Sequence, residues 1–132
     1  MILIKGYSIG GGNYDLRNWH RYNRIKVAIE RTPSFLSKAF TEKERELFKS
    51  KGMRVETIAG NFAAKEALSK ALGTGFRGYN LKNFEILRDN LGKPIVNISK
   101  EVRDKIGDRK LNINVSISHN KSNAIAFAIV EE

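Results

Sequence analysis

Several residue types are scarce in this sequence of 132 residues, which contains no cysteine, two prolines and one tryptophan. The absence of cysteine excludes a disulfide framework and a thiolate nucleophile, and it suits a reducing compartment. The sequence has no run of about 18 apolar residues, and its N-terminus lacks the apolar core of a signal peptide. These absences predict a soluble, cytoplasmic protein.

The composition is that of a small globular chain. Apolar residues make up 41% of the sequence, which is enough for a modest core. No stretch rich in proline, glycine or serine divides the chain into parts. We therefore predict a single domain over residues 1–132.

The chain is strongly basic, with 24 Lys and Arg against 14 Asp and Glu, a net charge of +10. A field of this sign attracts anionic partners and raises association rates at low salt. Nucleic acid is one such partner, so a small basic RNA- or DNA-binding module without catalysis is an alternative function. The basic residues are scattered, however, and the sequence contains no zinc-finger or RNA-recognition signature.

Three helices are predicted in the first half of the chain. The earliest spans residues 24–35 and is interrupted at Thr32 and Pro33, because proline disfavours helical geometry in the residue before it. The second runs from a capping box at Thr41 to about residue 51. The third and longest begins near residue 54 and ends at Gly73, which supplies a C-terminal cap.

The second half reads as strands over residues 84–88, 94–98, 113–118 and 124–130, with a short helix over 99–106. The predicted class is therefore α+β. In the third strand, apolar and polar residues alternate, so one face packs against the core and the other can meet a ligand.

Glu66 and Lys70 lie one turn apart on the longest predicted helix, beside an apolar stripe that contains Phe62. An ordinary Glu-to-Lys pair at this spacing stabilises a helix by about 0.2–0.5 kcal/mol. A charged pair beside a buried stripe also suits a functional site. The spacing alone leaves both interpretations open.

Three motifs occur in a fixed order: Asn61 to Gly75 reads NFAAKEALSKALGTG, Asp89 to Pro94 reads DNLGKP, and Val115 to His119 reads VSISH. They resemble the Phe-Ala-x-Lys-Glu-Ala-x-x-Lys-Ala-x-Gly-Thr-Gly helix, the Gly-Lys-Pro turn and the Val-Ser-Ile-Ser/Thr-His strand of the holo-[acyl carrier protein] synthases. These are small 4'-phosphopantetheinyl transferases. The resemblance extends from about residue 35 to residue 130.

The resemblance implies a 4'-phosphopantetheinyl transferase fold, in which a long central helix packs on an antiparallel sheet. It also implies transfer of 4'-phosphopantetheine from coenzyme A to a serine of acyl carrier protein, with release of adenosine 3',5'-bisphosphate, in support of fatty acid biosynthesis. Mg²⁺ would be the cofactor, and a homotrimer would carry active sites between its subunits. The carrier proteins served by this family are acidic, which suits the net charge of +10.

The same resemblance assigns roles to individual residues. Glu66 and Lys70 are the predicted catalytic residues. Glu66 is also the predicted Mg²⁺ ligand, and Lys70 would contact the pyrophosphate or the carrier protein. Either Glu66 or a metal-bound water would accept the serine proton. The residues expected to bind coenzyme A are Lys70, Gly73, Lys93, Pro94, Ser116 and His119. Without the motifs, a histidine at a strand end or a lysine in a turn is typical of a solvated surface.

The N-terminus departs from the family pattern, which supplies a second metal carboxylate from a first strand reading Gly-Ile/Leu-Gly-x-Asp-Ile/Val. Ser8 is the nearest match by strand position and Asp15 by distance along the chain, and both are poor substitutes. Residues 10–12, three consecutive glycines, are otherwise typical of a flexible loop.

A displaced reading frame is a further hypothesis for this segment. Residues 17–23 can be written AGG AAT TGG CAC AGA TAT AAT, which one nucleotide later encodes Gly-Ile-Gly-Thr-Asp-Ile. The same shifted frame contains ATG within TAT GAT for Tyr14 and Asp15. We therefore hypothesise that residues 1–23 are leader-derived or frame-shifted and that the true frame resumes near Arg24. On this hypothesis the chain as written lacks one Mg²⁺ ligand.

Overall fold

The computed structural model describes residues 2–10, 25–73, 80–120 and 123–132, with the backbone alone for 2–10 and Asn123. A helical stretch over residues 25–31 precedes the labelled helices. The other elements, in chain order, are β1 (Ile2–Gly10), α2 (Ser34–Ala39), α3 (Glu42–Ser50), α4 (Val55–Ala71), the 3₁₀ turn η1 (Leu81–Asn83), β2 (Phe84–Arg88), β3 (Pro94–Ile98), α5 (Lys100–Ile106), β4 (Asn112–His119) and β5 (Asn123–Glu131).

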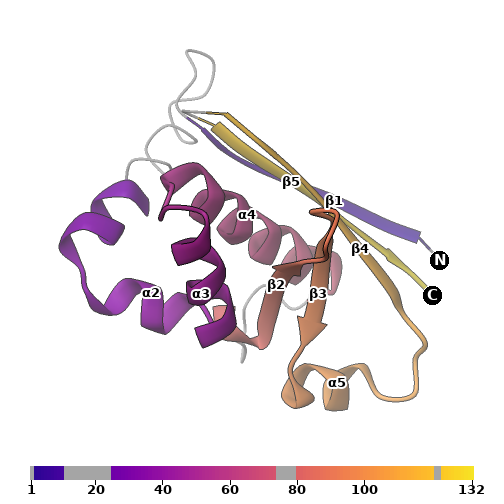
Figure 1. The fold of residues 1–132 in the computed structure, drawn as a ribbon. Coiled ribbons are helices and arrows are strands. Elements are labelled where there is room, and N and C mark those ends of the chain that lie inside the picture. Colours follow the sequence, from indigo (N-terminus) through magenta and orange to yellow (C-terminus); the bar gives the residue numbers. More distant parts are fainter. Residues whose placement is uncertain (1, 11–24, 74–79, 121–122) are drawn as a thin grey trace.

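The strands form two antiparallel groups, a sheet in the order β1-β5-β4 and a separate pair β2-β3. Helix α4 packs against all three strands of the larger sheet. Figure 1 shows α4 running along one face of this sheet, with α2 and α3 on the other side of the helix. This is the predicted α+β arrangement of a long central helix on an antiparallel sheet.

Small side chains bring α4 close to the sheet. One buried cluster contains Ala59, Ala63, Ala64, Ala67 and Ala71 of α4 together with Ala124, Ala126 and Ala128 of β5. At Gly60 the approach is too close for a side chain, because a Cβ added there would lie 2.9 Å from Cγ2 of Ile117 on β4. Glycine at position 60 therefore sets how near the helix lies to the end of β4.

The other face of α4 packs on α2 and α3 through a second apolar cluster of Ala39, Phe40, Phe48 and Ile58. The rings of Phe40 and Phe48 meet edge to face, with centroids 4.9 Å apart, a favoured geometry for aromatic pairs. Helix α4 is thus enclosed by the sheet on one side and by helices on the other. No helix in the described part of the chain is long and apolar enough to cross a bilayer.

Most of the predicted boundaries are confirmed. Strands β2 and β3 begin and end where the sequence places them, helix α5 begins one residue later than predicted, and β4 and β5 are each one residue longer at both ends. The capping box at Thr41 is present, with Thr41 accepting from the Glu44 N–H and Glu44 accepting from the Thr41 N–H. The first helix does break at Thr32 and Pro33, but the helix after the break, α2, extends to Ala39, beyond the predicted end at residue 35.

The N-terminal segment forms strand β1, which pairs with β5 along its length from Ile2 opposite Glu131 to Gly10 opposite Asn123. Ser8 occupies the register position opposite Ile125, whose side chain is partly exposed between the buried Ala124 and Ala126. Residues 11–24, including Asp15 and the segment 17–23 of the frame hypothesis, lie outside the described residues.

Candidate active site

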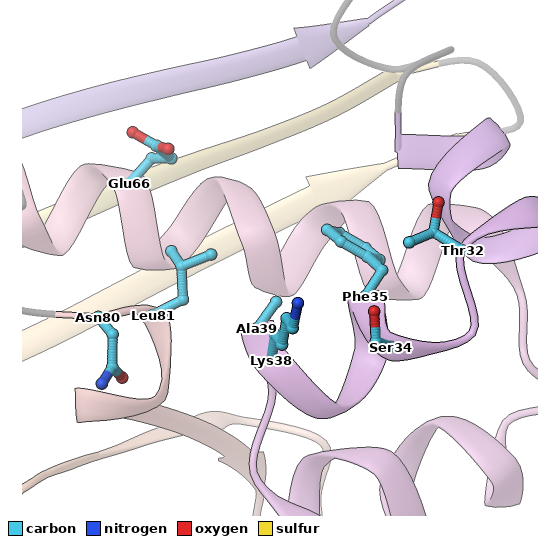
Figure 2. Close-up of a pocket in the computed structure, with 8 residues that line it drawn as sticks. All are labelled: Thr32, Ser34, Phe35, Lys38, Ala39, Glu66, Asn80 and Leu81. Carbon is cyan, nitrogen blue, oxygen red and sulfur yellow. The ribbon is translucent and has the colours of Figure 1, made fainter.

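A hollow of about 500 Å³ lies where α2, α4 and η1 meet, and Glu66 of α4 lines it. Figure 2 shows Glu66 on α4 and the other labelled side chains on α2, on the turn before it and at η1. The lining residues are Thr32, Ser34, Phe35, Lys38, Ala39, Glu66, Asn80 and Leu81. Glu66 is the one carboxylate among these lining residues, and it is half-buried. We call this space the Glu66 hollow.

The walls of the Glu66 hollow are held by local structure. The break at Thr32 and Pro33 redirects the chain into α2, where the ring of Phe35 meets that of Phe40 edge to face at 6.1 Å. On the opposite wall, Asn80 caps η1 by accepting from the Lys82 N–H at 2.9 Å, and its own N–H donates to Asn83 Oδ1 at 2.7 Å. The hollow is therefore bounded by a packed helix and a capped turn.

The donors around Glu66 fit a weakly liganded hard cation. Within the described residues, no group of three or more His, Asp or Glu side chains is placed to hold a metal ion. Mg²⁺ is commonly held by one or two carboxylates together with substrate phosphates and water. A single half-buried carboxylate fits this mode of binding and does not fit a site made by protein ligands alone. Figure 2 shows the hydroxyl-bearing Thr32 and Ser34 at the other end of the hollow from Glu66.

Lys70 and Gly73 lie at the C-terminal end of α4. Lys70 is in the last turn of the helix and is exposed, so it is not a buried charge. Gly73 follows the helix with a φ of +73° and open space around its Cβ position, which makes it a backbone cap, as predicted. Residues 74–79, which complete the Gly-Thr-Gly motif, lie outside the described part of the chain.

A second hollow, of about 580 Å³, lies beside the N-terminal end of α4, and His119 at the end of β4 lines it. It brings together Ser50, Lys51, Gly52, Arg54, Thr57, Arg88, Gly92 and His119. Three of these side chains carry a permanent positive charge and none is acidic. The space, which we call the basic hollow, is therefore suited to an anion such as a phosphate group.

The motif turn at residues 89–93 borders the basic hollow through Gly92. Asp89 organises this turn, because its Oδ1 accepts from the N–H groups of Leu91 and Lys93, each at 2.9 Å. Gly92 has a φ of +86°, which favours glycine. Lys93 itself is exposed next to the hollow, and Pro94 begins β3 opposite Arg88.

The two hollows lie on different sides of α4. Thr57 of the basic hollow and Glu66 are nine residues apart, which at about 100° per residue places them on nearly opposite faces of the helix. At about 1.5 Å per residue they are also separated by about 13 Å along the axis. The structure thus places Glu66 and His119, the two predicted site residues that line hollows, in separate hollows.

Ser116 belongs to neither hollow. It lies on β4 opposite Phe127 of β5, and both side chains are exposed on the face of the sheet away from α4. The predicted alternation is confirmed, since Ile113, Val115 and Ile117 pack against the core. Within one chain, Ser116 therefore lines neither the hollow of Glu66 nor that of His119, so its predicted contact with the ligand is not explained by a single chain.

The charged groups that the fold buries most deeply were not among those predicted. Glu44, Asn61 and Lys65 are fully buried between α3, α4 and β2. The Lys65 Nζ donates to Glu44 Oε1 at 2.6 Å, to the carbonyl of Leu81 at 2.9 Å and to the carbonyl of Phe84. These three acceptors match the three donors of an ammonium group. Sequence reasoning treated Glu44 only as part of a cap and did not consider Lys65.

Burial changes the acidity of this cluster. Burial raises the pKa of Glu44, although Lys65 opposes the shift, and burial lowers the pKa of Lys65, although Glu44 opposes it. Burial likewise lowers the pKa of Arg88, with Glu44 acting in the opposite direction. Removing one member leaves a charge without its partner, which in buried pairs costs about 3–5 kcal/mol of folding free energy.

Comparison with known proteins places the chain in a family. The sequence profile of the 4'-phosphopantetheinyl transferase superfamily matches residues 20–129. The chain is 53% identical over 109 residues to a holo-[acyl-carrier-protein] synthase of Clostridium beijerinckii, a match that covers 83% of this chain and 89% of the relative.

Solved structures of holo-[acyl-carrier-protein] synthases have the same fold as this chain. A holo-[acyl-carrier-protein] synthase of Neisseria meningitidis superposes with a TM-score of 0.81 at 27% identity, over 100% of both chains. One from Bacillus anthracis, in complex with CoA (3',5'-ADP), superposes with a TM-score of 0.74 at 33% identity, over 98% of this chain and 96% of that one.

Proposed function

Because the chain belongs to the 4'-phosphopantetheinyl transferase superfamily, we propose that it transfers 4'-phosphopantetheine from coenzyme A to a serine of acyl carrier protein. The observation that carries this proposal is that a chain so similar to curated synthases holds Glu66 in one hollow and a group of cations in another. In the reaction, the serine Oγ bonds to the phosphorus that bears the pantetheine arm. The bond from that phosphorus to adenosine 3',5'-bisphosphate breaks, and the serine proton passes to a base.

The basic hollow is the part of the chain that binds the nucleotide end of coenzyme A. Lys51, Arg54 and Arg88 supply positive charge for its phosphates, and His119 lies at the same opening. The adjoining turn adds Lys93 and Pro94. Lys70 and Gly73 lie at the other end of α4, near Glu66 along the helix, and would contact the substrate there. Phosphoryl transfer depends mainly on positioning and on neutralising charge, so cations held in place before the substrate arrives are of direct use.

Glu66 holds Mg²⁺ and is the candidate catalytic carboxylate. When bound, the cation neutralises negative charge that develops on the phosphate oxygens. Glu66 supplies a fixed carboxylate for it, and the carboxylate or a water beside it accepts the serine proton. A single protein carboxylate is at the low end of what Mg²⁺ uses, so Glu66 would hold the cation together with the substrate phosphates.

A complete site requires more than one copy of the chain. The Glu66 hollow and the basic hollow lie on opposite faces of α4, so one coenzyme A molecule can join them most simply between neighbouring subunits. The outer face of the sheet exposes Ile125 and Phe127 on its central strand, at 37% and 45%, and such apolar exposure is typical of an interface. We therefore propose a homotrimer in which Ser116, on that same face, approaches the site of a neighbour. Light scattering should give three times the chain mass of 14.9 kDa.

The second metal carboxylate is proposed to come from the shifted reading frame. The profile match begins at residue 20, inside the segment 17–23 that encodes Gly-Ile-Gly-Thr-Asp-Ile when read one nucleotide later. Neither Ser8, which pairs opposite Ile125, nor Asp15 offers the missing motif. Sequencing the coding DNA across residues 1–30 tests this directly.

The experiment that tests the function incubates the chain with apo acyl carrier protein, coenzyme A and Mg²⁺, and follows the mass of the carrier protein. The frame-restored chain is assayed in parallel. Gain of one phosphopantetheine group by either chain is the expected result, and no gain with either would reject the function. Stabilisation by coenzyme A with Mg²⁺ in thermal unfolding, with no stabilisation by RNA or DNA, separates the enzyme from the nucleic-acid-binding alternative. The single domain over residues 1–132, the role in fatty acid biosynthesis and the cytoplasmic location stay predictions.

A further inference from the structure

A continuous series of hydrogen bonds passes beside α4 from Arg88 to Leu81. Arg88 Nη2 donates to Asn61 Oδ1 at 2.8 Å, and Asn61 Nδ2 donates to Glu44 Oε2 at 3.1 Å. Glu44 Oε1 accepts from Lys65 Nζ at 2.6 Å, and Lys65 Nζ donates to the Leu81 carbonyl at 2.9 Å. Four side chains from α3, α4 and β2 are thereby linked to the η1 backbone.

The two ends of this series lie in the two hollows. Arg88 lines the basic hollow, and Leu81 lines the Glu66 hollow, where Figure 2 shows it beside Asn80. The three residues between them, Asn61, Glu44 and Lys65, are fully buried and line neither hollow. They can therefore act on a ligand only through the groups at the ends.

The buried bonds fix the orientation of Arg88. Its Nη2 is held by Asn61, and its Nη1 donates to the Leu87 carbonyl at 3.1 Å. A guanidinium whose plane is already set loses less conformational freedom when it binds a phosphate. Asn61 is itself held on two sides, because its Nδ2 also donates to the Ile86 carbonyl at 2.9 Å. Asn61, itself held by the core, thus holds the Arg88 guanidinium in one orientation.

Stability alone does not account for this arrangement. Buried ion pairs are often replaced by apolar residues of similar volume without loss of stability, so the burial of Glu44 and Lys65 is weak evidence that the pair serves stability. Within the described residues, every buried side-chain nitrogen and oxygen has a hydrogen-bond partner. A fully satisfied network of this kind specifies one geometry rather than several.

We propose that Asn61, Glu44 and Lys65 are positioning residues for the substrate, with Asn61 and Glu44 orienting Arg88 towards the anion in the basic hollow and Lys65 securing the η1 wall of the Glu66 hollow. The proposal rests on the proposed function, in that coenzyme A is taken as the anion. It assigns a role in ligand binding to three side chains that do not touch the ligand.

The test is a double-mutant cycle on coenzyme A affinity, measured by isothermal titration calorimetry. Asn61→Leu and Arg88→Leu should each raise the Kd for coenzyme A about tenfold, the loss of one bond to a charged group. The double variant should bind no more weakly than Arg88→Leu, because Asn61 acts through Arg88. Losses that multiply to about a hundredfold would overturn the proposal, as would an unchanged Kd for Asn61→Leu.

A matched control separates positioning from general destabilisation. Val102 of α5 is fully buried and lines neither hollow, so Val102→Ala should lower the melting temperature through a cavity and leave the Kd unchanged. If Asn61→Leu does not fold, Asn61→Ser enters the same cycle with the same expected pattern. If Val102→Ala raises the Kd as much as the Asn61 variant does, the effect is not positioning and the proposal is wrong.

The remote members are tested as a pair. Glu44→Met combined with Lys65→Met removes both charges and the acceptor of Asn61 Nδ2 at similar volumes, so the fold should persist. The Kd for coenzyme A should rise severalfold, through loss of order at Asn61, and an unchanged Kd would overturn the role of Glu44 and Lys65. The wild-type chain is titrated first: absence of any coenzyme A binding there rejects the proposed function, whereas normal binding with an additive cycle rejects only this inference.

Discussion

The two hollows beside α4 differ in the side chains that line them. The Glu66 hollow has apolar and hydroxyl-bearing walls with one carboxylate and one lysine, whereas the basic hollow gathers Lys51, Arg54 and Arg88 around His119. On the proposed function, the first provides a ligand for a cation close to the reacting phosphorus and the second holds the anionic end of the substrate. Three positively charged side chains are therefore gathered where the anion would bind. The Glu66 hollow, where the carboxylate would hold a cation, is lined by a single lysine.

We expect the largest loss of transfer activity from Glu66→Gln, tested in the frame-restored chain, because it alters only the Glu66 hollow and not the basic hollow. The change removes the one carboxylate of the Glu66 hollow and keeps the side-chain volume, so transfer should fall at least about a hundredfold with little change in melting temperature. Carrier-protein mass spectrometry measures the rate.

Glu56→Gln is the matched control, because it makes the same chemical change in the first turn of the same helix and should leave the rate unchanged. Transfer at the parental rate by Glu66→Gln would remove Glu66 from the role of metal ligand.

The second effect concerns the N-terminus. A chain that begins at the internal methionine, runs through Gly-Ile-Gly-Thr-Asp-Ile and rejoins the sequence near residue 24 should transfer phosphopantetheine readily, because an Asp on the first strand adds a second carboxylate for Mg²⁺. The 132-residue chain should be weakly active or inactive under the same conditions.

Replacing the new Asp by Asn in the restored chain should return activity to the low level of the chain as written. Full activity of the 132-residue chain, with intact mass confirming residues 1–23, would show that the frame hypothesis is wrong.

The third effect is a fall in binding affinity with added salt, which we expect because the basic hollow binds its anion through charge. Charges on the surface are screened over a Debye length of about 8 Å at physiological ionic strength, so affinities for coenzyme A and for an acidic carrier protein should fall steeply as salt is added. Titration calorimetry at low and high sodium chloride measures both.

Arg88→Leu should make the coenzyme A affinity less sensitive to salt, because one of the cations of the basic hollow is gone. Affinities that do not change with salt would contradict the assignment of the anion to this hollow.

The smallest effect is expected from Gly60→Ala. The added Cβ would lie 2.9 Å from Cγ2 of Ile117 and 3.8 Å from the His119 ring, so the Ile117 side chain or strand β4 must shift, at a cost of about 1–3 kcal/mol. Thermal unfolding should show lower stability, and coenzyme A should bind more weakly because His119 moves with the strand.

Gly107→Ala is the control, since its φ of +69° strains an alanine while nothing lies within 4 Å of the new Cβ. It should lower stability without altering coenzyme A affinity. Equal affinity in the Gly60 and Gly107 variants would show that the position of His119 is unimportant.

Local patterns predicted the elements of this fold well. The capping box at Thr41, the glycine after α4 and the alternation along β4 act over a few residues, so they can be read from adjacent letters of the sequence. The end of α2 was misplaced because Phe40, which follows the helix, is fully buried against Phe48 of α3, a contact that the local sequence does not contain.

The motifs identified the family and singled out Glu66 and His119, each of which lines a hollow in the structure. The cations that accompany His119 were not predicted, because Arg54 and Arg88 come from separate elements and meet only when β2 packs beside α4. Lys65 was passed over because the motif presents it as a neighbour of Glu66, whereas the helix turns it towards Glu44, with which it pairs.

The sequence by itself determined the class of the fold, the bounds of most elements, the family and the residues that carry its motifs, because short-range patterning and spacing are written in consecutive residues. Tertiary structure alone decided which charges are buried, which cations share a hollow and that Glu66 and His119 line separate hollows beside α4. Those properties depend on contacts between segments far apart in the chain, where burial and desolvation change what each charged group can do.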